Sequence, residues 1–379
     1  MDSRVLRGVL FVAVGLLALW PTVGIALHSP AATAGAYAAN LTDAWVFDCV
    51  ADRVLEGRFP YGDPWLTACV GERGGAPPTF ALPFRYPPTS LPLFAGLGFL
   101  DPRAGVVATA VLGLVACLVA AFAWLRPSDV RGFVMLALGL GWSVPAFLNA
   151  ALAQTGTWLA AACLGLVAAP APIQGGLLLA AIGLKPQYGV PLGALLLARA
   201  AWREVAVGAA ATAAVAVGVE LWLGPGVTAA WLHALTDDND TLAAMATWRA
   251  LAPAFRDPAL DVPSIGAWLV ACGVLAVASR RMERERAVAF VLPIAAALSP
   301  NSHPYDLAIW ALPAAVIARD RGHRPEAGVL VLGVVLQVIR LGAAAVALPV
   351  SWRVTLAPIA LAIGLGAAWG GRGATAARR

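Results

Sequence analysis

The stretch VLRGVLFVAVGLLALWPTVGIAL, residues 5–27, decides the class of fold to which this protein belongs. A helix needs about 20 mostly apolar residues to cross a bilayer, and this stretch supplies them with Arg7 as its only charge. Arg4 precedes it, as in a secretion signal, but the stretch is long and lacks a clear small-residue cleavage site. We therefore expect it to be retained as the first membrane helix.

The rest of the chain has the composition of a membrane protein. Hydrophobic residues make up 60% of it and charged residues only 12%, whereas soluble domains are about 25% charged. Further apolar segments are 104–124, 131–149, 155–170, 173–184, 187–199, 204–223, 264–279, 286–299, 304–318, 326–347 and 352–370. They predict an all-α polytopic membrane protein with about 10–12 transmembrane helices, folded as one integral membrane domain over residues 1–379.

Several of these segments are short for a membrane span. Short segments predict broken helices whose ends lie in protein or in a wet cavity. Segment 88–100 is also short and contains or adjoins several prolines. We expect it to form a re-entrant segment or a half-helix rather than a crossing.

Arginine placement predicts the orientation, because basic residues in short loops stay on the cytoplasmic side. The turns at 199–203, 279–286 and 319–324 carry most of the basic excess, together with both termini. The opposite, outer face then receives the turn at 299–306 and the bend at Lys185. It also receives the two long loops, residues 28–87 and 224–263.

The first outer loop contains a predicted amphipathic helix. Apolar residues recur at helical spacing between Asn40 and Trp65, which is typical of a helix lying at the membrane interface. Asp43, at its start, has two candidate roles, capping the helix or acting in catalysis. Asp48 and Asp52 lie one turn apart near its polar side, where a solvated face is favoured over a paired-carboxylate metal site.

Several kinds of ligand site have no motif in this chain. The sequence contains no HExxH or CxxC motif, no P-loop, and no GxGxxG that opens a helix after a strand. We therefore expect no dedicated metal centre, no nucleotide substrate and no cofactor.

Lys185 is the only lysine among the basic residues. It lies between apolar runs in AIGLKPQYGV, residues 181–190. Snorkelling of the ammonium group to the lipid headgroups would explain a charge there, but an arginine would snorkel equally well. A compact ammonium beside a proline-broken helix is a better match for a point contact with a phosphate at the outer leaflet.

Two further polar stretches lie at membrane depth. The first, SPNSHPYDLAIW at 299–310, is a functional-site candidate because ionisable residues are clustered in it, although a lone loop histidine is usually only solvated. Its polar residues include Asn301, Ser302, His303, Tyr305 and Asp306. The second, LNAALAQTGTWL at 148–159, contributes Asn149 and Gln154, whose alternative role is hydrogen bonding between helices.

Four stretches follow one another in chain order: DAWVFDCVADRVLEGRFPYGDP (43–64), RYPPTSLPLF (85–94), LKP (184–186) and SPNSHPYDL (299–307). Together they resemble glycosyltransferase family 87, a family of multipass transferases of the GT-C class that use polyprenyl-phosphate sugars. The family's pattern in the first loop is an aspartate followed by aromatic residues. Asp43, with Trp45 and Phe47 after it, matches that pattern.

The resemblance implies inverting transfer of a hexose, with mannose as the family's precedent, from a polyprenyl-phosphate donor to an envelope glycolipid or glycan. The reaction would take place at the outer face of the bacterial cytoplasmic (inner) membrane. Asp43 would take the proton from the acceptor hydroxyl, while Lys185, helped by Arg85 and His303, would stabilise the departing phosphate. The predicted substrate-binding residues are Asp48, Tyr86, Gln154, Tyr305 and Asp306.

Two other classes of protein are alternatives. A transporter or flippase for a lipid or a small polar solute would share the broken helices and the polar residues at mid-membrane. The chain shows no convincing internal repeat, however, and its large acidic outer loop favours an acceptor site. In a scaffold protein of an envelope-assembly complex, Asp43 would only cap a helix and Lys185 would only snorkel.

Cys49 and Cys69 are the two cysteines that lie in the predicted outer loop, where disulfides persist. They either form a bridge that closes a loop of about 20 residues, or Cys49 is a buried free thiol on the apolar side of its helix. The other cysteines fall in apolar segments, where a thiol is ordinarily a small buried hydrophobe. They are Cys117, Cys163 and Cys272.

Overall fold

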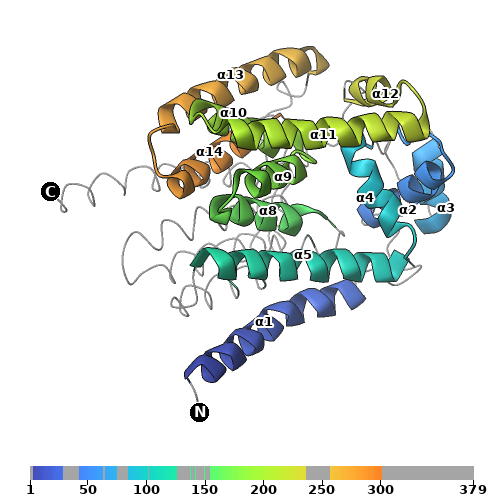
Figure 1. Cartoon of the computed structure of the whole chain (residues 1–379). Coiled ribbons are helices and arrows are strands. Elements are labelled where there is room, and N and C mark those ends of the chain that lie inside the picture. Colours follow the sequence, from blue (N-terminus) through green and yellow to red (C-terminus); the bar gives the residue numbers. More distant parts are fainter. Residues whose placement is uncertain are drawn as a thin grey trace, which may run out of the picture.

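A computed structural model (Figure 1) describes residues 3–28, 42–62, 65–74, 84–100, 102–125, 154–235 and 257–300, and residues 137, 141 and 149. Every regular element in this part of the chain is a helix, so the predicted all-α class is confirmed. The helices form two groups. The larger group is called the bundle below, and the short helices at one end of it are called the cap.

Three helices of the bundle are long and apolar enough to cross a membrane, as expected for a membrane protein. They are α5 (Pro102–Leu125), α11 (Trp202–Leu223) and α13 (Asp261–Ser279), the last preceded by η5 (Pro258–Leu260). A further helix, α1 (Ser3–His28), packs along α5, with the ring centroids of Phe11 and Phe122 4.8 Å apart. The predicted number of crossings stays a prediction, because segments 304–318, 326–347 and 352–370, and all but three residues of segment 131–149, lie outside the described residues.

Four bundle helices are shorter, which agrees with the prediction of broken helices from the short apolar segments. They are α8 (Gly156–Ala168), α9 (Pro172–Ile182), α10 (Pro186–Ala198) and α14 (Arg284–Leu298). Two of them begin with proline, which suits the first helical position because no amide hydrogen is needed there.

The helix α9 runs alongside the first half of α11. A Cβ atom at Gly176 of α9 would lie 2.6 Å from the carbonyl oxygen of Glu204 in α11. One at Gly208 of α11 would lie 3.0 Å from the carbonyl oxygen of Gly176. Glycine at these positions therefore lets the two backbones approach closely. Past this contact α9 ends at Ile182, whereas α11 continues to Leu223 at the cap (Figure 1).

The helix α8 has a similar position beside α5. Trp158, near its start, donates a hydrogen bond from Nε1 to the carbonyl oxygen of Thr109, at 3.0 Å. The hydroxyl of Thr157 lies against Gly113. These contacts place the start of α8 near the middle of α5, so its first turn lies within the bundle rather than at its end.

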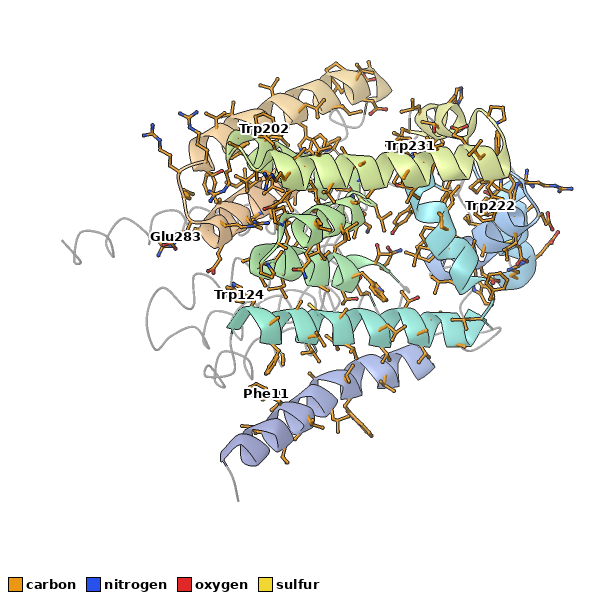
Figure 2. The ribbon with its side chains drawn as sticks, in the orientation of Figure 1. Phe11, Trp124, Trp202, Trp222, Trp231 and Glu283 are labelled. Atoms are coloured by element: carbon orange, nitrogen blue, oxygen red, sulfur yellow. A yellow bond between two sulfur atoms is a disulfide. The ribbon has the colours of Figure 1, made fainter. Side chains whose placement is uncertain are left out.

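The cap covers the end of the bundle where α5 begins and α11 ends (Figure 1). It consists of α2 (Thr42–Leu55), α3 (Trp65–Gly74), η1 (Pro88–Ser90), α4 (Leu91–Leu97) and α12 (Val227–Ala234). Figure 2 shows Trp222 and Trp231 at this end of the molecule and Trp202 and Glu283 at the other. The apolar core of the cap is separate from that of the bundle, and it is completed by Val106 and Ala110 of α5 and by Val219 and Leu223 of α11.

The helices of the cap correspond to two segments for which the sequence made predictions. The predicted amphipathic stretch forms α2, and its apolar residues Val46, Val50 and Val54 are buried in the cap core. Segment 88–100 forms η1 and α4. As predicted, it does not form a full crossing.

Candidate functional site

Three segments that are distant in the sequence meet at the side chain of Tyr86. Its hydroxyl donates a hydrogen bond to Oε1 of Gln154 at 3.0 Å and lies 3.3 Å from Oγ1 of Thr155. The ammonium nitrogen of Lys185 lies over the same ring, 5.4 Å from its centroid. The structure thus brings together three of the predicted site residues, Tyr86, Gln154 and Lys185.

Lys185 lies at the bend between α9 and α10, and it is only 5% exposed. Its backbone amide donates to the carbonyl oxygen of Ile182 at 3.1 Å, and its carbonyl accepts from the amide of Gly189 at 3.2 Å. A Cβ atom at Gly189 would lie 2.7 Å from Cα of Gly183, so two glycines allow the chain to turn this sharply. The ammonium group therefore belongs to the residue directly before the first turn of α10. The positive end of a helix dipole and a lysine at the same place favour an anion.

The turn before α8 supplies the amide partner of Tyr86. Asn149 and Gln154 are both 1% exposed. Oδ1 of Asn149 accepts from the amide of Gly156 at 2.6 Å, and its carbonyl accepts from the amide of Gln154 at 2.9 Å. Asn149 therefore stabilises the start of α8, while the Gln154 side chain is directed to the site.

The loop that carries Tyr86 is held by two aromatic side chains that sequence reasoning did not identify. Trp231 of α12 donates from Nε1 to the carbonyl oxygen of Arg85 at 3.1 Å. Tyr61 donates from its hydroxyl to the carbonyl oxygen of Tyr86 at 2.9 Å. Burial raises the pKa of Tyr61, so its hydroxyl stays protonated and able to donate. Arg85 is partly buried in the same loop, and its predicted role as a phosphate ligand stays a prediction.

The position of Trp231 depends on the turn between α11 and α12. Gly224 and Gly226 have φ values of 101° and 103°, a region that favours glycine. Glu220 at the end of α11 accepts from the amides of Gly226 and Thr228 at 2.8 and 2.7 Å, which caps α12. A carboxylate and two glycines therefore direct α12 back over the Tyr86 loop.

An aromatic cluster joins α2 to the site. Phe47 of α2 stacks on Phe94 with ring centroids 4.6 Å apart and meets Tyr86 edge-on at 5.7 Å. Asp43 belongs to the first turn of α2 and lies four residues before Phe47, one helical turn away. The side chain of Asp43 lies outside the described residues, so its role as catalytic base stays a prediction.

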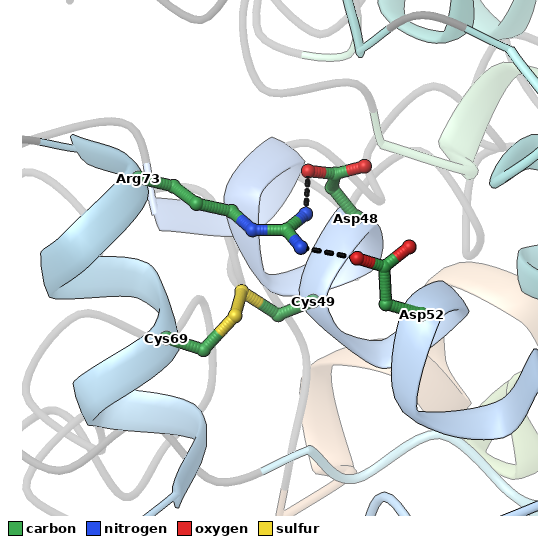
Figure 3. The surroundings of a disulfide bond; sticks show 5 residues. All are labelled: Asp48, Cys49, Asp52, Cys69 and Arg73. Atoms are coloured by element: carbon green, nitrogen blue, oxygen red, sulfur yellow. Dashed lines mark hydrogen bonds and ion pairs between the residues drawn. A yellow bond between two sulfur atoms is a disulfide. The ribbon is translucent and has the colours of Figure 1, made fainter. Parts of the chain in front are cut away.

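Asp48 and Asp52 are both paired with Arg73 of α3 (Figure 3). Their side chains are 15% and 51% exposed, so the interpretation of both as a solvated face was wrong for Asp48. Burial alone would lower the pKa of Arg73, but the hydrogen bonds and charges of Asp52 and Asp48 raise it. The ion pairs connect α2 to α3, and a role of Asp48 in substrate binding stays a prediction.

Beside this ion pair, Cys49 of α2 and Cys69 of α3 form a disulfide (Figure 3). Of the two alternatives for these cysteines, the structure therefore contains the bridge and not the buried free thiol at Cys49. Arg53 adds a third connection, because its guanidinium lies 4.4 Å from the ring centroid of Trp65. The helix α2, which carries Asp43 and Phe47, is thus held to α3 by covalent, ionic and cation–π contacts.

The remaining predicted site residues, His303, Tyr305 and Asp306, lie outside the described residues. The stretch that contains them begins at Ser299, which is 1% exposed at the end of α14. Within the described residues, no group of three His, Cys, Asp or Glu side chains lies close enough together to hold a metal ion.

Comparison with known proteins identifies the family. The family model of glycosyltransferase family 87 matches residues 84–300, which is more than half of the chain. The match includes Tyr86, Gln154 and Lys185, whereas Asp43 precedes it and His303 follows it. No curated protein and no solved structure matches the chain. The polar cluster around Tyr86 lies within the matched region, among long apolar helices. The chain is therefore a membrane protein that belongs to glycosyltransferase family 87.

Proposed function

We propose that this chain is an inverting glycosyltransferase of the GT-C class. It transfers a hexose, with mannose the expected sugar, from a polyprenyl-phosphate donor to a glycolipid or glycan acceptor of the cell envelope. Membership of glycosyltransferase family 87 supports glycosyl transfer as the reaction. The donor class, the acceptor and the side of the membrane are the new parts of the proposal.

The position of Lys185 is the observation that carries the choice of donor. A lysine within an apolar bundle is costly, and ionisable residues at such depth are usually functional. Lys185 is 5% exposed and lies at the start of α10, above the Tyr86 ring. An ammonium group and a helix N-terminus together suit a phosphate. A phosphate carried on a polyprenyl chain would reach this depth from within the bilayer.

The proposed mechanism has one displacement step. Asp43 takes the proton from the acceptor hydroxyl as its oxygen attacks the anomeric carbon, and the bond from that carbon to the phosphate oxygen breaks. The departing polyprenyl phosphate takes the bonding electron pair, and Lys185 stabilises the charge that develops on it. Arg85 and His303 assist Lys185 in this proposal. The proposed substrate contacts are Tyr86, Gln154, Asp48, Tyr305 and Asp306.

The proposed location is the bacterial cytoplasmic membrane, which the chain crosses several times with the cap on the outer side. The disulfide between Cys49 and Cys69 supports this orientation, because disulfides persist outside the cytoplasm and are rare within it. The turns at Arg199 and at Arg280 lie at the opposite end of the bundle, as expected for cytoplasmic turns rich in arginine.

Transfer by purified protein tests the proposal. The full chain in detergent would be mixed with polyprenyl-phosphate mannose carrying a radioactive sugar, and membranes from cells that lack the protein would supply the acceptor. We expect labelled glycan to form and polyprenyl phosphate to be released only when the protein is present. Transfer from a nucleotide sugar in membranes stripped of polyprenyl phosphate would contradict the choice of donor. Movement of the labelled donor across vesicles without any transfer would favour the flippase alternative.

A further inference from the structure

The end of the bundle away from the cap is formed by two turns that are joined to each other. Arg199, at the turn between α10 and α11, donates from Nη1 to the carbonyl oxygen of Arg280 at 3.1 Å and to that of Met282. Arg284, at the start of α14, makes two hydrogen bonds to the carboxylate of Glu204 in α11, at 2.9 and 2.6 Å. The turn after α10 and the turn after α13 therefore form one surface.

This surface has an excess of positive charge. Residues 199–204 and 280–286 contain six arginines and three glutamates. Glu204 is paired with Arg284, and Glu283 lies 3.7 Å from Arg286. Glu285 also has contacts of its own. Two of the three carboxylates, those of Glu204 and Glu283, are therefore engaged with the more buried Arg284 and Arg286.

Three arginines of the surface point outward. Arg203, Arg280 and Arg281 are exposed, and none of them forms an ion pair with another described residue. They lie where α11 begins and α13 ends, and both helices are long and apolar enough to cross a membrane. Trp202, which is 63% exposed, lies at the same level. Tryptophan is enriched at membrane–water interfaces.

We propose that Arg203, Arg280 and Arg281 bind the headgroup of an anionic phospholipid, such as phosphatidylglycerol, at this end of the bundle. A guanidinium can form two parallel hydrogen bonds to a phosphate, and Trp202 beside Arg203 fits the depth at which a headgroup meets the acyl chains. Anionic lipid is the chosen partner because the arginines lie at the ends of two candidate spans. This proposal does not rest on the proposed sugar transfer.

A lipid-binding measurement tests this proposal. The full chain in nonionic micelles is titrated with acyl-labelled phosphatidylglycerol, and binding is followed by fluorescence anisotropy. An arginine near an anionic lipid surface contributes about fivefold in affinity, so R203Q/R280Q/R281Q should bind the probe on the order of 100-fold more weakly. Phosphatidylcholine with the same label should bind weakly to both proteins. The single variant R203Q should bind about fivefold more weakly. R58Q is its matched control, because Arg58 is exposed in the cap and the change in charge is the same. R58Q should leave the affinity unchanged.

Two outcomes would overturn the proposal. One is a triple variant that binds phosphatidylglycerol within about twofold of the parent, since loss of three phosphate ligands should cost far more. The other is displacement of the probe by millimolar inorganic phosphate, which would indicate a site for a soluble anion. Thermal unfolding of the triple variant without added lipid checks that it is folded; with the parent's unfolding midpoint, weak binding reports on the surface itself.

Discussion

The ammonium nitrogen of Lys185 lies 5.4 Å from the centre of the Tyr86 ring, while the hydroxyl of the same tyrosine donates to Gln154 at 3.0 Å. One side chain therefore orders the bend before α10 through its ring and the turn before α8 through its hydroxyl. Substitution can separate these two contributions.

Tyr86→Phe removes the hydroxyl and keeps the ring above Lys185. A neutral hydrogen bond contributes about 0.5–1.5 kcal/mol, so we expect up to about a tenfold loss of transfer. Tyr86→Leu also removes the cation–π contact and should raise the KM for the donor further. Donor titrations of the two variants test this. Equal losses in both would mean that the ring has no role beyond filling space.

Lys185→Ala should reduce use of the donor more than use of the acceptor. Loss of one group that stabilises developing charge typically costs about 10²- to 10³-fold in kcat. Lys185→Arg should restore activity only in part, because a planar guanidinium does not reproduce a compact point charge. Transfer rates at varied donor concentration distinguish the outcomes. A harmless alanine variant would support snorkelling, and full rescue by arginine would mean that only the charge matters.

Asp43→Asn should abolish transfer while the protein stays folded in the membrane. Removing a positioned general base is expected to lower the rate by about 10²- to 10⁴-fold. Asp48→Asn is the comparison variant rather than a neutral control, since Asp48, a proposed substrate contact on the same helix, is paired with Arg73. Rates from labelled donor decide between the carboxylates. Near-normal activity of Asp43→Asn would remove Asp43 from the mechanism.

Gly189→Ala tests whether the shape of the bend positions Lys185. The added Cβ would lie 2.7 Å from Cα of Gly183, so α9 and α10 must separate. Overpacking of this kind costs about 1–3 kcal/mol, and a loss of donor binding of that size is about a fivefold or larger rise in the KM for the donor. Gly193→Ala is the control, because the same methyl group there would meet nothing within 4 Å. Equal activity of the two variants would contradict a role for the bend.

Cysteine mapping tests the disulfide and the orientation of the cap together. In protein prepared without reductant, Cys49 and Cys69 should resist alkylation and should be found as one crosslinked peptide pair. Replacing both with serine should destabilise the protein by about 3 kcal/mol in the chain-entropy account, measured as a lower midpoint of thermal unfolding. Arg73→Gln is a control that weakens the same α2–α3 contact and leaves the bridge intact. Free thiols at both positions would contradict the bridge.

The pattern of residues along the chain was enough to predict the class of fold and three of the residues at the site. Hydropathy is a local property, so the apolar runs predict helices, and the short runs predict α8, α9 and α10 as broken ones. Lys185 was recognised because it is the only lysine. Tyr86 and Gln154 belong to polar or family-like stretches between apolar segments.

Which of these residues meet, and what holds them in place, depends on how the helices pack against one another. Tyr61 and Trp231 act by donating to the carbonyl oxygens of residues 86 and 85. A carbonyl oxygen is present in every residue, so the identity of the accepting residue contains no signal for such a bond. Similarly, Asp48 looks like part of a solvated face until α3 brings Arg73 beside it. Long-range contacts depend on how separate helices pack, and that packing cannot be read from the spacing of residues along one helix.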